Sequence, residues 1–229
     1  MLPIGDDNRH RQSWPIVTAV LVVINVLVFF YQVSLGPEIQ SFINNWGVVP
    51  VDILAGASFI TLLTSMFMHG GWAHLIGNMT FLWIFGDNIE DRLGRWKYLG
   101  FYLLTGLAAS ATHISLNPAS SIPSVGASGA ISGILGAYIV LFGSNRVRVL
   151  IGRAVQTVPA WTMLGLWALQ QGVATFAVIG QTEQTSGVAY GAHLGGFIAG
   201  VIGAFIIRAV LPQQQKRSSQ QDSVPVARR

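Results

Sequence analysis

The sequence predicts an all-α, polytopic membrane protein with six transmembrane helices packed as a bundle. Three observations predict this class. Charged residues make up 10% of the 229 residues, whereas soluble proteins average about 25%. The chain contains 26 glycines, and glycine is more frequent in membrane helices than in soluble ones. Its apolar residues also gather in six runs, and a bilayer-spanning helix needs roughly 17–25 such residues.

The six runs are the predicted spans, of which the second and the fourth are short. They are Pro15–Tyr31, Trp72–Phe85, Tyr98–Ile114, Ala127–Phe142, Pro159–Ile179 and Val188–Val210. No small-residue cleavage site follows the first run, so we expect a retained anchor and not a removed signal peptide. We therefore expect an N-terminal cytoplasmic segment, 1–14, a membrane domain, 15–211, and a disordered tail, 212–229, that is rich in polar and basic residues.

The segment Gln32–Gly71 lies between the first two spans and is broken by glycine, proline and asparagine residues. Its apolar piece, Phe59–Met68, is too short to cross a bilayer. We therefore expect an interfacial or re-entrant element in this first outside loop.

Positive charge predicts the orientation. Six spans put the N-terminus, Asp87–Lys97, Asn145–Arg153 and the tail on one side, which then carries all 13 Lys and Arg residues. The positive-inside rule makes that side cytoplasmic. We expect no nucleic-acid partner, because no clustered basic face with base-reading residues is recognisable. Short loops and the lack of a targeting segment favour a bacterial inner membrane, with both termini in the cytoplasm.

Four polar side chains are predicted to meet at one depth. The second, fourth and sixth spans run in the same direction, so depths can be counted from their cytoplasmic ends. At about 1.5 Å per residue, Ser128 lies about 25 Å, His193 about 22 Å and His74 about 20 Å from that end, with Asn78 one turn deeper. A polar or ionisable residue inside a membrane is a candidate functional residue.

Small residues surround the serine and the histidine. Such faces let helix backbones approach closely in lipid, so Ser128 and His193 are expected within hydrogen-bond reach. Taken alone, each motif is more typical of helix packing than of catalysis, and the matched depth is what favours a function. The small faces consist of Gly129 and Gly133 in the fourth span and of Ala192, Gly196 and Gly200 in the sixth.

A serine beside a histidine is a minimal nucleophile and base. The hydroxyl becomes nucleophilic when an adjacent base takes its proton, and histidine has a suitable pKa. We therefore predict an intramembrane serine protease in which Ser128 is the nucleophile and His193 the general base. His74, Asn78 and the backbone N–H of Ser128 are the predicted oxyanion donors. No Asp or Glu lies inside a span, so no third carboxylate is expected. We also expect a water-filled cavity above Ser128, roofed by part of Gln32–Gly71 and walled by the fifth span, which carries Gln170 and Gln171.

Four motifs together resemble the rhomboid family of intramembrane serine proteases. The resemblance implies the basic six-helix form and an endopeptidase that cleaves transmembrane segments of other membrane proteins, without metal or cofactor. It also assigns supporting roles to His69, Gly126 and Gly129. The motifs are His74-x-x-x-Asn78, Glu90-Asp91-Arg92-Leu93-Gly94, Gly126-x-Ser128-Gly129 and Ala192-His193-x-x-Gly196.

The chain differs from many members of that family at two places. The first outside segment has no Trp-Arg pair. Ser132 stands four residues after the predicted nucleophile, where many members carry an aromatic residue that packs on the histidine. We therefore expect the ring of His193 to be held in a different way.

Other chemistries fit the sequence less well. A zinc protease would need H-E-x-x-H on a helix, and no glutamate lies between His69 and His74. An aspartyl protease would need two aspartates inside the spans. The open alternative is a non-catalytic, rhomboid-like protein that binds transmembrane segments. A small transporter is less favoured, because internal repeats of interrupted helices are not recognisable.

Overall fold

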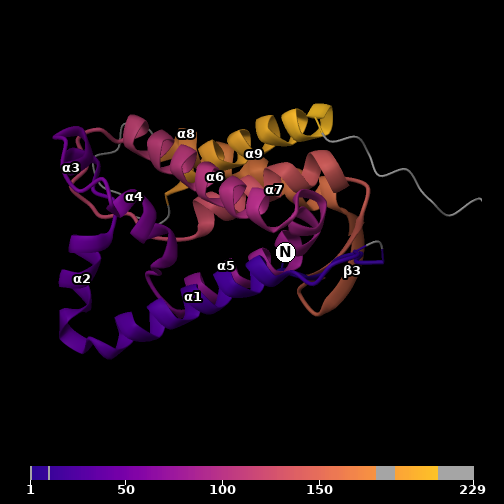
Figure 1. Cartoon of the computed structure of the whole chain (residues 1–229), viewed down its shortest axis with the longest axis horizontal. Coiled ribbons are helices and arrows are strands. Elements are labelled where there is room, and N and C mark those ends of the chain that lie inside the picture. The colour runs from indigo at the N-terminus through magenta and orange to yellow at the C-terminus, as the bar shows by residue number, and fades with distance from the viewer. Residues whose placement is uncertain (1, 10, 179–188, 211–229) are drawn as a thin grey trace, which may run out of the picture.

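A computed structural model describes residues 2–9, 11–178 and 189–210. The protein is a helical bundle with short helices at one end and a small sheet at the other (Figure 1). Each long helix overlaps one predicted span, so the predicted polytopic helical bundle is confirmed. The predicted tail, 212–229, and Val188, where the sixth predicted span begins, lie outside the described residues. The long helices are α1 (Ile16–Ser34), α5 (Trp72–Leu93), α6 (Arg95–Leu116), α7 (Ser128–Phe142), α8 (Ala160–Val178) and α9 (Tyr190–Val210).

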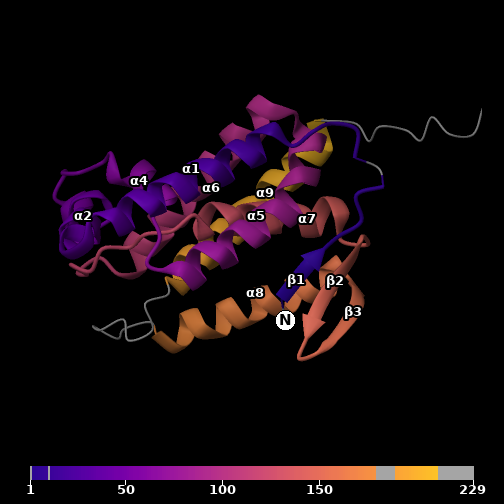
Figure 2. The same cartoon turned by 90° about the horizontal axis from the view of Figure 1, so that it is seen from below.

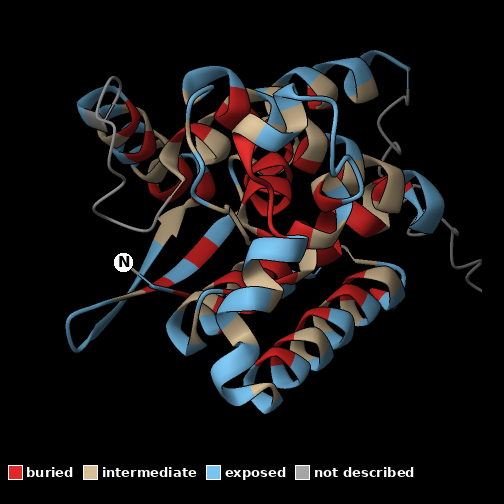
Figure 3. Cartoon of the chain, turned by 90° about the vertical axis from the view of Figure 1, so that its left-hand side faces the viewer, coloured by how far each residue is buried: buried red, intermediate tan, exposed pale blue. Residues whose placement is uncertain are grey.

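Length and apolarity suit several of these helices to a bilayer. Among the described helices, α1, α6 and α9 are long and apolar enough to cross a membrane, and α7 is apolar over 15 residues. Buried residues lie where the helices face one another, whereas the outer faces are exposed (Figure 3). Large apolar side chains such as Leu27, Phe176 and Phe205 point outward from α1, α8 and α9. Soluble proteins rarely expose so much apolar surface, whereas lipid would cover it.

Helix α5 continues well past Phe85, where the second predicted span ends. Its last turns carry Asp87, Asn88 and Glu90, which are buried inside the bundle. Hydropathy marks these residues as a loop, but their polar groups are satisfied by hydrogen bonds to the N-terminal segment and α1. The predicted boundary is therefore wrong by about two turns.

The segment between α1 and α5 consists of short pieces, as predicted, and gathers at one end of the bundle (Figure 1). None of these pieces could span a bilayer. A bridge between Val48 and Ser124, with backbone hydrogen bonds of 2.8 and 2.9 Å, ties the segment to the chain before α7. The pieces are η1 (Gly36–Glu38), α2 (Ile39–Trp46), α3 (Pro50–Leu54), α4 (Thr61–Thr64) and η2 (Ser65–Phe67).

The other end of the bundle carries an antiparallel sheet that is not predicted from the sequence (Figure 2). Strands β2 (Arg146–Ile151) and β3 (Ala154–Pro159) form a hairpin, and β1 (Leu2–Gly5) pairs with β2. The segment 146–151 alternates exposed and buried residues, which is the period of a half-buried strand. Gly152 supplies the left-handed turn with φ +61°. This alternating pattern is only six residues long. It also lies in a segment whose positive charge assigns it to a loop.

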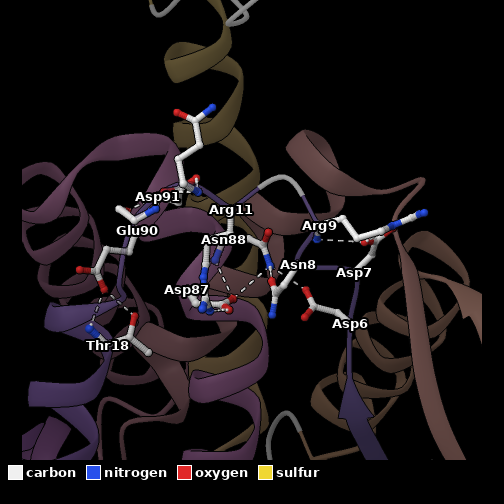
Figure 4. A network of polar contacts seen from close by, with 12 residues as sticks. Asp6, Asp7, Asn8, Arg9, Arg11, Thr18, Asp87, Asn88, Glu90 and Asp91 are labelled. Atoms are coloured by element: carbon white, nitrogen blue, oxygen red, sulfur yellow. Dashed lines mark hydrogen bonds and ion pairs between the residues drawn. The ribbon is translucent and has the colours of Figure 1, made fainter. Parts of the chain in front are cut away.

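The Glu90-Asp91 pair holds the start of α1 (Figure 4). The Glu90 carboxylate accepts hydrogen bonds from the backbone N–H of Val17 and Thr18, at 2.9 and 2.8 Å, and from the Thr18 hydroxyl, at 2.8 Å. Asp91 accepts hydrogen bonds from the backbone N–H and the hydroxyl of Ser13. These carboxylates satisfy N–H groups that lack acceptors within a first helical turn, where negative charge is also favourable.

A second group of contacts joins the N-terminal segment to α5 and α7. Arg11 pairs with Asp87 at 2.7 Å. Asp6 accepts hydrogen bonds from the Asn88 amide, at 2.7 Å, and from the Tyr138 hydroxyl, at 2.6 Å. The N-terminal segment, the α5–α6 turn and the hairpin, which charge assigns to one side of the membrane, therefore lie at the same end of the molecule.

Glycines bring α7 and α9 into backbone contact. A Cβ atom on Gly196 would collide with the carbonyl oxygen of Gly129, and one on Gly200 with that of Gly133. On the other side of α7, a Cβ atom on Gly129 would lie 2.6 Å from Cβ of Ala109 in α6. The predicted close approach of the small-residue faces is thus confirmed.

Replacing Gly200 by alanine should destabilise the bundle. The added methyl group meets a backbone carbonyl that cannot rotate away, and overpacking costs about 1–3 kcal/mol. We expect Gly200→Ala to lower the melting temperature in detergent. Gly100→Ala is the matched control, because nothing lies within 4 Å of a Cβ atom at that helical glycine. Equal melting temperatures for the two variants would contradict the assigned α7–α9 contact.

Candidate active site

Ser128 and His193 form a direct contact. Ser128 is the first residue of α7 and His193 lies in the first turn of α9. The Oγ atom of Ser128 is 2.7 Å from Nε2 of His193. The two side chains that matched depth predicts to meet are therefore within hydrogen-bond distance.

The ring of His193 is held from α8. Its Nδ1 atom lies 2.7 Å from Oε1 of Gln171. Trp167, one turn earlier in α8, lies beside the ring, with centroids 6.1 Å apart. Ser132 instead turns to its own helix and donates a hydrogen bond to the carbonyl of Ser128 at 2.6 Å. The ring is thus held without an aromatic residue at position 132.

Gly126 shapes the chain just before the serine. Its φ angle of +141° is a backbone conformation that side chains disfavour. A Cβ atom there would lie 2.9 Å from Nε2 of His74 and 3.4 Å from Oγ of Ser128. The backbone N–H of Gly126 donates to the Ser65 carbonyl at 2.9 Å, which fixes the turn. Glycine therefore leaves open the space between the serine and His74.

His74 has one ring nitrogen engaged and the other turned toward this space. The backbone N–H of Gly70 donates to its Nδ1 atom at 3.3 Å. Since a neutral imidazole carries a single proton, Nδ1 as acceptor leaves Nε2 as the N–H donor. The Nε2 and Cε1 atoms of His74 are the ones closest to where a Cβ atom of Gly126 would lie. The Nε2–H donor therefore faces the space that Gly126 leaves open.

Asn78 lies one turn further along α5 and is 8% exposed. Its Nδ2 atom is buried and has no hydrogen-bond partner among the described residues. The residue nevertheless lines the cavity over Ser128. A buried donor without a partner costs about 1–3 kcal/mol, which an acceptor in the cavity would recover.

His69 is fully buried behind His74. The two rings pack edge to face, with centroids 5.1 Å apart. The side chain of Gln32 in α1 holds the backbone of His69, accepting from its N–H at 3.0 Å and donating to its carbonyl at 3.3 Å. Burial, and to a smaller extent the nearby His74, lowers the pKa of His69 to about 3. A neutral His69 therefore supports His74 from outside the cavity.

A cavity of about 670 Å³ lies over these groups, lined by Ser128, His193, His74 and Asn78. The first loop contributes Val48, Ser65 and Met66 to its wall, as expected of a roof made by Gln32–Gly71. The expectation that the fifth span forms another wall is wrong for the described residues. Helix α6 takes that place, and α8 lies at the edge of the bundle (Figure 2), where it contacts His193 from behind.

His113, one of the α6 residues that line the cavity, is not predicted as a site residue from the sequence. This residue is buried, and its Nδ1 atom lies 3.4 Å from the Asn117 side chain. In the sequence it is a single histidine near the end of the third predicted span. Depths are compared only among the second, fourth and sixth spans, so this histidine is not matched with the other polar residues. Among the described residues, no group of three or more His, Asp or Glu side chains is placed to hold a metal ion.

Comparison with known proteins relates the chain to a protein family. The rhomboid domain family model matches residues 56–210, which is more than half of the chain. The chain is 30% identical to "Rhomboid protein 1, mitochondrial" of Saccharomyces cerevisiae over 203 residues, covering 86% of this chain and 55% of the yeast protein. It is 32% identical to "Rhomboid protease GluP" of Bacillus subtilis over 133 residues, covering 58% of this chain and 26% of that protein.

A third relative is "Rhomboid protease AarA" of Providencia stuartii, with 28% identity over 207 residues that cover 81% of this chain and 70% of the relative. The chain thus spans about half or less of the first two relatives and most of the third. On the family match and these relatives, the chain belongs to the rhomboid family.

Proposed function

We propose that the protein is an intramembrane serine endopeptidase that uses Ser128 as nucleophile and His193 as general base. The observation that carries this proposal is the 2.7 Å contact between Ser128 Oγ and His193 Nε2 at a cavity. Relatives named as proteases support a hydrolase at the level of the family.

The chemistry follows from the contact. His193 takes the hydroxyl proton as Ser128 Oγ bonds to the scissile carbonyl carbon, and the carbonyl oxygen becomes an oxyanion. His193 then gives the proton to the leaving amine as the C–N bond breaks, which leaves an acyl-enzyme. A water molecule deprotonated by His193 attacks the ester, and the serine is released when the proton returns to Oγ.

Three donors suit the oxyanion. They are Nε2–H of His74, the Nδ2 amide of Asn78 and the backbone N–H of Ser128, which begins a helix and so has no acceptor within it. The positive end of the α7 dipole adds to this field. The unpartnered Asn78 donor supports the assignment, because an oxyanion would supply the acceptor that the described residues do not.

The expected substrates are transmembrane segments of other membrane proteins. A bundle whose outer faces are apolar would share the bilayer with such segments. Charge supports an orientation with both termini in the cytoplasm and the cavity in the outer half of the membrane. The bacterial inner membrane stays a prediction, because the relatives include a mitochondrial protein as well as bacterial ones.

The competing function is that of a non-catalytic family member that binds transmembrane segments. Such a protein would need the cavity but not a serine in contact with a basic ring nitrogen. The presence of both residues at 2.7 Å favours the enzyme. Reaction of the purified protein with a fluorophosphonate probe separates the two functions, since only an activated serine is labelled.

Ser128→Ala should abolish both probe labelling and cleavage of a model transmembrane substrate. His193→Ala should do the same, because no other base contacts the hydroxyl among the described residues. Both variants should keep the melting temperature within a few degrees of the wild type. Near wild-type turnover in either variant would rule out the dyad.

Asn78→Ala should slow cleavage by roughly 10²–10³, the effect of losing one oxyanion donor, with little change in substrate affinity. Steady-state kinetics would separate kcat from KM. Thr80→Val is a control on the same helix, because the Thr80 hydroxyl bonds only to the Ile76 carbonyl within α5 in the described contacts. A change confined to KM would make Asn78 a substrate-binding residue.

The orientation can be tested with single cysteines, since the chain has none. Ser124 lines the cavity and Ser144 is exposed near the hairpin at the opposite end. Ser124→Cys should react with a membrane-impermeant thiol reagent added outside, and Ser144→Cys only with reagent on the cytoplasmic side. The reverse pattern would overturn the orientation and the outer position of the active site.

A further inference from the structure

Gln171 is a polar side chain that has no role in the proposed chemistry. It lies on α8, is 6% exposed and is not among the residues that line the cavity. Its amide oxygen is 2.7 Å from Nδ1 of His193. The ring therefore has a partner at each nitrogen, with Ser128 at Nε2 and Gln171 at Nδ1.

This pair of contacts admits one arrangement of protons. An amide oxygen can only accept, so Nδ1 must carry the proton of the neutral imidazole. Nε2 is then left with its lone pair toward the Ser128 hydroxyl. That tautomer is the one in which the ring can act as a base toward the serine.

We propose that Gln171 is a positioning residue for His193, which selects the Nδ1–H tautomer and fixes the direction of the ring. This inference rests on the proposed protease function. Gln171 takes the place that a carboxylate holds in a Ser-His-Asp arrangement, but it is neutral and comes from a different helix than the other two groups. The proposal assigns it no contact with substrate.

The surroundings of Gln171 support this role. Trp167, on the same face one turn away, lies beside the His193 ring and also 6.0 Å from the ring of Phe197. The backbone carbonyl of Gln171 accepts a hydrogen bond from Thr175. The adjacent Gln170, which has the same chemistry, is exposed on the outer side of α8. Helical geometry thus turns one glutamine toward the histidine and the other away from it.

The test compares isosteric changes at the two glutamines. Gln171→Met keeps the length and apolar volume of the side chain and removes the acceptor. We expect kcat to fall roughly 10²-fold, within the about 10²–10⁴ that a positioned base contributes, with KM unchanged. Gln171→Glu restores an acceptor and should recover most of that loss. Gln170→Met should match the wild type.

Two results would overturn the proposal. One is Gln171→Met with wild-type kcat, and the other is Gln171→Glu with the same loss as Gln171→Met. Residual cleavage by Ser128→Ala in the same assay would instead show that the proposed function is wrong. Melting temperatures of the two methionine variants would show whether any loss comes from unfolding.

A spectroscopic measurement tests the tautomer without relying on activity. In ¹⁵N-histidine-labelled protein, the His193 signals can be assigned by comparison with His193→Ala. We expect the wild type and Gln170→Met to show neutral imidazole protonated at Nδ1. Gln171→Met should shift these signals toward a mixture of tautomers. Protonation at Nε2 in the wild type, or an unchanged spectrum in Gln171→Met, would contradict the role of Gln171.

Discussion

The close contact between α7 and α9 is the constraint on which the rest of the structure depends. Gly196 and Gly200 lie against the carbonyls of Gly129 and Gly133, so any larger side chain would push the two helices apart. Ser128 directly precedes Gly129, and His193 lies one turn before Gly196. The spacing of the backbones therefore sets the 2.7 Å distance between serine and histidine. In lipid, where the hydrophobic effect does not drive helices together, such packing has to come from small residues.

Helix α5 connects the two ends of the molecule. Its first turns supply His74 and Asn78 to the cavity, whereas its last turns supply Glu90 and Asp87 to the network that holds α1 and the N-terminal segment. The first outside loop is tied to the turn before α7, since the Ser65 carbonyl accepts a hydrogen bond from the N–H of Gly126, and to α1, since the Gln32 side chain bonds to the backbone of His69. His74 and Asn78, the two side chains proposed as oxyanion donors, thus lie on an element that is fixed at both ends, as preorganised electrostatic stabilisation requires.

Much of the fold and half of the site's geometry could be predicted from the sequence. Apolar runs gave the long helices, because burial in lipid depends on length and hydropathy alone. Counting residues along each helix correctly brought Ser128 and His193 together. Depth does not give rotation about a helix axis, so it could not tell Gln171 from Gln170 or place α6 in the wall in the position expected for α8. The sheet was missed because the pairing of β1 with β2 joins residues far apart in sequence, and because the local β2–β3 hairpin lies in a short basic segment that charge assigns to a loop.

A neutral amide beside His193 suits the location of the site. A carboxylate at that depth would have to leave water, and the desolvation of a buried charge often exceeds what its pairing returns. An amide oxygen supplies the same acceptor for Nδ1–H at a lower cost of burial. In the proposed reaction it would give less support to the imidazolium, so more of the transition-state stabilisation would have to come from the proposed oxyanion donors. The unpartnered Nδ2 of Asn78 and the Nε2–H of His74, both held on α5, are the groups in position to supply it.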